Sequence, residues 1–127
     1  MALHVLIVDD SAVSRKMIAR TLEMSGLDIA VVHEAGDGNQ ALEVLEHNWM
    51  DLALVDINMP NMNGEELVMR LRARPETAML PVVVVSTEGS ETRIAKMHTL
   101  GAEFVRKPFS PEGLRVAVMG LLGVEDA

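Results

Sequence analysis

The sequence contains no cysteine and no tyrosine, and its aromatic residues are one tryptophan and two phenylalanines. Without cysteine the chain can form neither a disulfide nor a thiolate zinc site, and this composition is compatible with a reducing cytoplasm. So few aromatic side chains leave no platform on which the bases of a single-stranded nucleic acid could stack.

Basic residues are also scarce, because 11 Lys and Arg stand against 19 Asp and Glu, for a formal net charge of -8. This charge has the wrong sign for binding to a phosphate backbone, so we expect no direct contact with nucleic acid. The apolar run near the start of the chain is too short to span a membrane and lacks the flanks of a signal peptide. We therefore expect a cytoplasmic protein that does not insert into a membrane.

A chain of 127 residues fits one compact domain, and a globule of this size buries roughly two-thirds of its unfolded surface. The sequence contains no linker, low-complexity stretch or repeat, so we predict a single domain over residues 1–127. Short apolar runs alternate with segments of helical length. The predicted strands cover residues 3–8, 27–34, 52–56, 81–86 and 103–106. Four of the five are almost continuously apolar, as strands covered on both faces should be.

Between the strands, the spacing of apolar residues and the capping signals predict five helices. In the first helix, Ser11 can cap the start and Gly26 can end it. Its predicted apolar half consists of Val13, Met17, Ile18, Leu22 and Met24. The later helices are expected over about 39–48, 64–74 and 90–101, and from 110 onward with Pro111 in the first turn. Five strand–helix repeats with short loops predict a doubly wound α/β fold, with a parallel sheet covered on both faces.

Chemically useful side chains stand where the predicted strands end. They are Asp9 and Asp10 after the first strand, Asp56 on the third, Ser86 and Thr87 on the fourth, and Lys107 after the fifth. Ligands of such sheets bind at the carboxyl ends of the strands, so we expect these groups to converge. Three clustered carboxylates repel one another unless a cation joins them, and an all-oxygen ligand set favours magnesium, calcium or manganese over zinc. Magnesium leaves room for a phosphate oxygen, which suits phosphoryl transfer.

From residue 3 to about 122 the chain resembles the receiver domains of bacterial two-component response regulators, and most closely the single-domain chemotaxis regulators among them. The matching stretches are "VDDSAVSRKMI", "EAGDGNQAL", "DLALVDINMPNMNGEEL", "PVVVVSTEG" and "GAEFVRKPFSPE". The resemblance implies a flavodoxin-like sheet of five parallel strands in the order 2-1-3-4-5, with five helices. It also implies a phosphoacceptor that catalyses its own phosphorylation and dephosphorylation, rather than an enzyme acting on other substrates.

The resemblance further implies that Asp56 accepts a phosphoryl group from a phosphohistidine on a histidine kinase. Asp9, Asp10 and Asp56 would then hold Mg²⁺, Asp10 directly and Asp9 through water, together with the main-chain carbonyl of Asn58. A carboxylate nucleophile must stay ionised, and the charge that develops on the phosphoryl oxygens must be compensated. Magnesium and Lys107 would supply that compensation.

Two further residues acquire roles through the resemblance. Ser86 would donate its hydroxyl to the phosphoryl group, and Phe104 stands where many relatives have a tyrosine that turns inward on activation. Whether Phe104 moves or stays packed is left open by the sequence. Lys107 and Pro108 match a cis-proline turn of the family.

The last predicted helix has apolar residues on two sides. Leu114, Ala117, Val118 and Leu121 form one stripe, whereas Val116 and Met119 fall outside it. An apolar second side favours a docking surface for a partner protein, with scattered surface methyl groups as the alternative. We take Phe104, Val116 and Met119 as the candidate partner surface.

The resemblance implies a phosphorylation-dependent switch without an output domain, with the flagellar motor switch as the candidate downstream target, and we expect a monomer before phosphorylation. Asn58, Glu88 and the run "KPFSPE" favour the chemotaxis type. Two alternatives are a phosphorelay intermediate and the receiver domain of a longer regulator. Two enzyme alternatives fit less well. The anions of "DDSAVSR" would repel a flavin phosphate, and Asn58 stands where a haloacid-dehalogenase-type phosphatase has its second acid.

Overall fold

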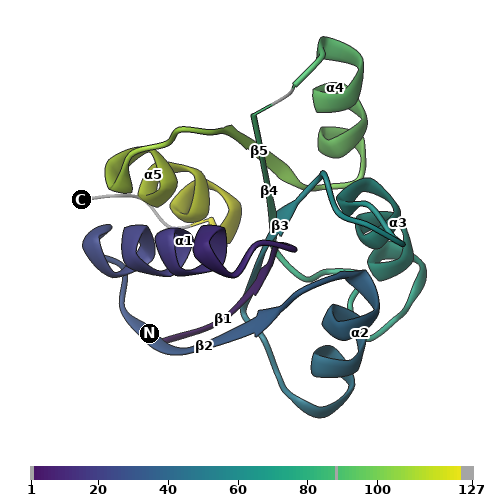
Figure 1. Cartoon of the computed structure of the whole chain (residues 1–127), viewed down its shortest axis with the longest axis horizontal. Helices are drawn as coiled ribbons and strands as arrows, with labels where there is room; N and C mark the ends of the chain where they lie inside the picture. Colours follow the sequence, from purple (N-terminus) through teal and green to yellow (C-terminus); the bar gives the residue numbers. More distant parts are fainter. Residues whose placement is uncertain (1, 88, 124–127) are drawn as a thin grey trace.

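A computed structural model describes residues 2–87 and 89–123, so Glu88 lies outside the described residues. Strands and helices alternate along the chain (Figure 1). The strands are β1 (Leu3–Val8), β2 (Ile29–Ala35), β3 (Leu52–Asp56), β4 (Val82–Ser86) and β5 (Glu103–Arg106). The helices are α1 (Ala12–Met24), α2 (Gly38–His47), α3 (Gly64–Ala73), α4 (Glu91–Thr99) and α5 (Pro111–Leu122).

The five strands form one parallel sheet in the order β2-β1-β3-β4-β5, which confirms the predicted topology. Figure 1 shows the sheet between two helical layers, with α1 and α5 on one face and α2, α3 and α4 on the other. The predicted boundaries agree closely, although β2 begins at Ile29 instead of residue 27 and ends at Ala35.

Alternate residues of the central strands supply two separate cores. On β3, Ala53 and Val55 pack toward α2, α3 and α4, whereas Leu52 and Leu54 pack toward α1 and α5. Because both faces of β1, β3 and β4 are covered, their sequences are almost continuously apolar. The expectation of full burial is wrong for β2. This strand lies at the edge of the sheet, and Val31 on it is 38% exposed.

Helix α1 buries a narrower stripe than predicted. Ile18 and Leu22 are buried, but the predicted partners Val13, Met17 and Met24 are exposed by 70%, 66% and 66%. At 100° per residue these three positions lie about 120° or more around the helix from the midpoint between Ile18 and Leu22. A helix lying on a sheet covers only the stripe that faces the strands, so the apolar half of α1 is mostly surface.

The predicted helix ends are confirmed. Ser11 and Ser110 each accept a hydrogen bond from a backbone N–H of the first turn, and Pro111 occupies the start of α5. Gly26 follows α1 with a φ of 84°, a conformation that glycine adopts without steric cost. Ser90 caps α4 in the same way as Ser11 caps α1. These caps fix where each helix starts relative to the preceding strand.

Gly64 brings the start of α3 against the end of β3. A Cβ at this position would lie 2.2 Å from the main-chain oxygen of Asp56, and the Gly64 N–H donates to the carbonyl of Ile57 over 2.9 Å. From the sequence we expected only the start of a helix at this position. The structure shows that glycine is needed for a close backbone approach beside Asp56.

Replacing Gly64 by alanine should therefore lower the free energy of unfolding by about 1–3 kcal/mol, because neither backbone can move aside without disturbing β3. Gly120→Ala is the matched control, since no atom lies within 4 Å of a Cβ built there; it should raise stability by about 0.4–1 kcal/mol. Urea denaturation measures both variants. Equal stabilities for the two would show that the approach at Gly64 is not tight.

Candidate functional site

Three carboxylates converge at the carboxyl ends of β1 and β3, as predicted. Asp9, Asp10 and Asp56 each offer an oxygen, and these oxygens all lie within 4.8 Å of one another. Asp9 and Asp56 are buried, 1% and 7% exposed, whereas Asp10 is open to solvent. The cluster therefore has a buried side, formed by the strands, and an open side from which an ion or a phosphoryl group can enter.

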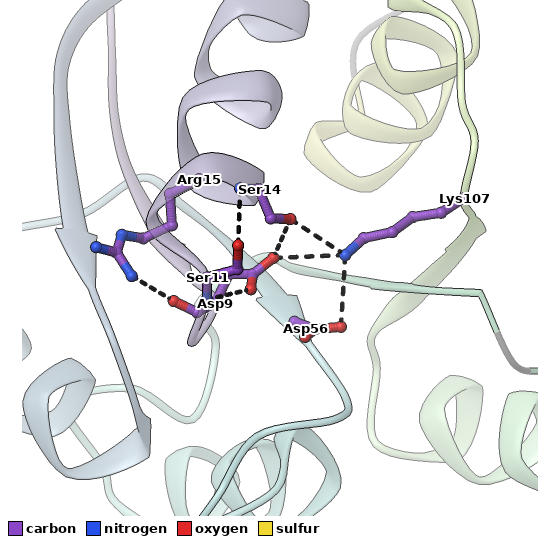
Figure 2. Close-up of polar contacts among 6 residues, drawn as sticks. All are labelled: Asp9, Ser11, Ser14, Arg15, Asp56 and Lys107. Atoms are coloured by element: carbon purple, nitrogen blue, oxygen red, sulfur yellow. Dashed lines mark hydrogen bonds and ion pairs between the residues drawn. The ribbon is translucent and has the colours of Figure 1, made fainter.

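Lys107 reaches this cluster from the end of β5 (Figure 2). Its Nζ lies 3.4 Å from Asp9 Oδ2 and 3.6 Å from Asp56 Oδ1. The Lys107 backbone N–H donates to the carbonyl of Ser86 over 2.9 Å, and the peptide bond between Lys107 and Pro108 is cis, as the resemblance implied. The ammonium thus lies between two of the three acids.

Ser86 ends β4 at the same edge of the sheet. The β3–β4 register places Asp56 beside Val85, and Ser86 is the next residue. Its side chain is fully buried, whereas Thr87 is exposed. The structure therefore brings Ser86, but not the Thr87 side chain, into the buried part of the strand edge.

The loop after β3 also contacts Asp56. The backbone N–H of Asn58 donates a hydrogen bond to the Asp56 carboxylate, and the Asn58 residue itself is exposed. The role of its carbonyl as a metal ligand stays a prediction.

The Asp56 carboxyl has a pKa raised above its ordinary value. Burial is the largest cause, because it disfavours the charged form, and the negative charges of Asp9 and Asp10 act in the same direction. The Lys107 ammonium and the Asn58 hydrogen bond lower the pKa but do not cancel the effect of burial. The ionised carboxylate would thus be stabilised by one more positive charge.

A hard divalent cation fits these residues. The donor set is all oxygen, with one exposed and two buried carboxylates, and no histidine or cysteine among them. Such a set is typical of magnesium, which binds few protein ligands and keeps several waters on its open side. An acidic cluster of this kind is typical of the magnesium site of receiver domains.

Two residues of this site were missed by the sequence reasoning. Ser14 Oγ makes a short hydrogen bond with Asp9 Oδ2 and lies 3.4 Å from Lys107 Nζ. Arg15 donates through Nη1 to the Asp9 carbonyl over 2.6 Å and pairs with Glu34 at 2.8 Å. The sequence did contain one indication of these contacts. Ser14 and Arg15 stand three and four residues after the cap Ser11, and this spacing turns both side chains toward the preceding loop.

The candidate partner surface is only partly brought together. Phe104 and Val116 line the same shallow hollow between α4, β5 and α5, and Val116 is 58% exposed. Met119 does not join them. It lines a different hollow with Leu3 and Leu27, because it lies one turn further along α5, beside the start of β1.

Phe104 is half-buried and packs against the loop that leads into α4. A Cβ at Gly89 would lie 2.9 Å from the Phe104 ring. Phe104 carries no hydroxyl, and the Gly89 carbonyl instead accepts a hydrogen bond of 2.6 Å from Arg106 Nη2. The switch role of Phe104, a movement of the ring on activation, stays a prediction.

A hollow of about 450 Å³ lies at the other end of the sheet, where β3 and β4 begin. It includes Trp49 and Met79, which are 76% and 90% exposed. Its distance from the acids means that it is not part of this site. Among the described helices, none combines the length and the apolar character that crossing a membrane requires.

Comparison with known proteins identifies the class of this site. Residues 5–119 match the family model described as the response regulator receiver domain, and the chain belongs to this family. A receiver domain is a phosphoacceptor signalling module and not an enzyme in the ordinary sense. It works with histidine kinases and with downstream effectors.

The relatives include single-domain proteins of similar length. The chain is 34% identical over 123 residues to a chemotaxis protein CheY homolog of Campylobacter jejuni, covering 95% of this chain and 93% of the relative. It is 33% identical over 126 residues to the chemotaxis protein CheY1 of Helicobacter pylori, covering 98% and 100%. The solved structure of the chemotaxis protein CheY4 of Vibrio cholerae superposes with a TM-score of 0.82 at 32% identity, covering 95% and 99%.

The raised pKa of Asp56 predicts a pH-dependent effect of Asp56→Asn on stability. The native state holds the Asp56 proton more tightly than the unfolded chain, so stability falls as the pH rises from the ordinary pKa through the raised one. In magnesium-free buffer near neutral pH, the variant should have a higher free energy of unfolding than the wild type. Its advantage should vanish once the pH is below both pKa values.

Urea denaturation across this pH range measures the difference in the free energy of unfolding between Asp56→Asn and the wild type. Added magnesium should reduce this difference, because it stabilises only the complete carboxylate cluster of the wild type. If the variant were instead less stable at neutral pH, the attraction of Lys107 would outweigh the effect of burial.

Proposed function

We propose that Asp56 accepts a phosphoryl group from a phosphohistidine of a histidine kinase in a magnesium-dependent reaction. The observation that carries this proposal is the placement of one buried carboxylate between Lys107 and two further acids at the strand edge. In this proposal residues 1–127 form a single receiver domain that works in the cytoplasm. Phosphorylation changes its affinity for a partner protein in chemotaxis.

The positions of the side chains support the following reaction. An Asp56 carboxylate oxygen attacks phosphorus as the bond from phosphorus to the kinase imidazole breaks, and the electron pair of that bond leaves with the imidazole nitrogen. Negative charge is spread over the three equatorial phosphoryl oxygens in the transition state. Lys107 Nζ, 3.6 Å from Asp56, is placed to bind one of them.

Ser86 acts after the transfer in this proposal. It ends the strand next to β3, one register position beyond the residue that pairs with Asp56. Its hydroxyl would donate to a phosphoryl oxygen, and that movement would carry the change to the loop between β4 and α4. Arg106 donates a hydrogen bond to the Gly89 carbonyl in that loop, and the Phe104 ring packs against Gly89.

The metal ligands in this proposal are the carboxylates of Asp9, Asp10 and Asp56 and the main-chain carbonyl of Asn58. Bound magnesium supplies positive charge that keeps Asp56 ionised and compensates the phosphoryl oxygens. The raised pKa of Asp56 supports this assignment, since the carboxylate alone is disfavoured in its charged form.

A role in chemotaxis is supported by the similarity to named chemotaxis proteins over nearly the whole chain. The hollow between α4, β5 and α5, where Phe104 and Val116 offer an apolar surface next to the loop that follows Ser86, supports a contact with a partner protein. A surface in this place can report the state of Asp56 to a partner. We propose the flagellar motor switch as that partner.

Incubation with magnesium and acetyl phosphate tests the phosphoacceptor. Intact mass spectrometry should show the gain of one phosphoryl group in the wild type, and the gain should disappear with a chelator or in Asp56→Asn. The same incubation of Asp51→Asn is the control, because Asp51 lies at the opposite end of β3. Phosphorylation that persists in Asp56→Asn would assign the reaction to another residue.

Val116→Glu tests the partner surface. Binding of the phosphorylated chain to the flagellar motor switch protein of the same organism, measured by calorimetry, should weaken by about tenfold or more, because a charge would enter the apolar contact. Met119→Glu is the matched control on the same helix, since Met119 lines a different hollow. The same loss of binding in both variants, or no loss in either of them, would contradict this surface.

A further inference from the structure

The Ser14 hydroxyl lies between the two charged groups that the proposed reaction needs most. Ser14 Oγ is hydrogen-bonded to Asp9 Oδ2 and is 3.4 Å from Lys107 Nζ, so it contacts an acid of the metal cluster and the phosphoryl-binding lysine (Figure 2). Lys107 Nζ is itself 3.4 Å from Asp9 Oδ2. The three groups form a closed triangle above Asp56.

The chemistry of the groups fixes the direction of these hydrogen bonds. An ammonium has only protons to donate, and an ionised carboxylate only accepts. Lys107 therefore donates to Ser14 Oγ, and the one Ser14 hydroxyl proton goes to Asp9 Oδ2. A serine hydroxyl can do both at once, whereas alanine or valine can do neither.

Other residues hold Asp9 but do not reach the lysine. The Ser11 N–H donates to Asp9 Oδ1 over 2.9 Å, and Arg15 donates to the Asp9 carbonyl. Asp9 Oδ2 thus accepts hydrogen bonds from both Ser14 and Lys107, while Oδ1 accepts one from the Ser11 N–H among the described residues. A carboxylate oxygen has two lone pairs, so Oδ1 keeps acceptor capacity for a metal-bound water.

We infer that Ser14 is a positioning residue that joins Lys107 to Asp9 and so sets the magnesium affinity of the cluster and the starting position of the lysine. The inference rests on the proposed function and adds a residue to it. By donating to Asp9 Oδ2, Ser14 holds the Asp9 carboxylate in one orientation, with acceptor capacity left on Oδ1. By accepting from Lys107, it holds the ammonium near Asp56 before a phosphoryl group arrives.

Substitutions at Ser14 separate the hydroxyl from the shape of the side chain. Threonine and valine are nearly equal in size, and only threonine carries the hydroxyl. Ser14→Val should raise the magnesium dissociation constant by about tenfold, the low end of the usual effect of residues that orient metal ligands. Ser14→Thr should stay close to the wild type.

Isothermal calorimetry with magnesium chloride alone measures this constant without any phosphodonor. Trp49 fluorescence would be a poor probe, because the tryptophan lies at the opposite end of the sheet. Thr21→Val is the matched control, since it also removes a hydroxyl from α1, and this hydroxyl donates to the Met17 carbonyl and, within the described part of the chain, contacts none of the acids. Its magnesium affinity should equal that of the wild type.

A second readout concerns the lysine. At saturating magnesium, Ser14→Val should be phosphorylated by acetyl phosphate several-fold more slowly than Ser14→Thr, because Lys107 has lost the neutral acceptor that holds it beside Asp9 and Asp56. If Ser14 had a purely structural role, its substitution would lower the stability in urea. The valine and threonine variants would then have the same magnesium affinity and the same phosphorylation rate.

Equal magnesium affinity in Ser14→Val and the wild type, or equal weakening in the valine and threonine variants, would overturn the inference. So would a wild type that binds no magnesium. If the valine variant loses affinity as expected but acetyl phosphate modifies neither protein, the positioning role of Ser14 at the metal cluster stands and the proposed phosphoacceptor function fails.

Discussion

Three carboxylates at one edge of the sheet repel one another, and this repulsion is the constraint that the rest of the site has to meet. Asp9 and Asp56 are almost fully buried there, and Asp10 stands beside them. Burial and like charge both raise the pKa of Asp56, and Lys107 offsets them only in part. A site that remains short of positive charge is prepared to bind a cation and then a group whose charge must be compensated.

The fold supplies the rigidity that such a site requires. Two separate cores cover the faces of the sheet, so the ends of β1, β3 and β4 cannot move independently. The first turns of α1 hold Asp9 through Ser11, Ser14 and Arg15, and the absence of a side chain at Gly64 lets α3 start directly against Asp56. These local contacts fix the distances between the acids, which charge alone would drive apart.

Much of this arrangement could be predicted from the sequence because it follows from the order of strand ends. Apolar runs located the strands, and parallel strands bring their carboxyl ends together, so Asp9, Asp10, Asp56 and Lys107 could be assigned to one site. The spacing of Ser14 from Ser11 indicated only that it lies near the preceding loop, because its contacts with Asp9 and Lys107 depend on how α1 is rotated above that loop. The same rotation left Val13 and Met17 exposed, although their spacing matched an apolar face. Met119 was grouped with Val116 because periodicity does not show which neighbouring element faces each turn of α5.

A crystal structure with magnesium and beryllium trifluoride, which mimics a phosphoryl group on a carboxylate, would show whether Asp56 is the phosphoacceptor. We expect beryllium bonded to an Asp56 oxygen, magnesium between Asp9, Asp10 and Asp56, and Lys107 Nζ and the Ser86 hydroxyl in contact with fluoride. Magnesium bound elsewhere, or beryllium on another residue while Asp56 stays paired with Lys107 alone, would contradict this expectation.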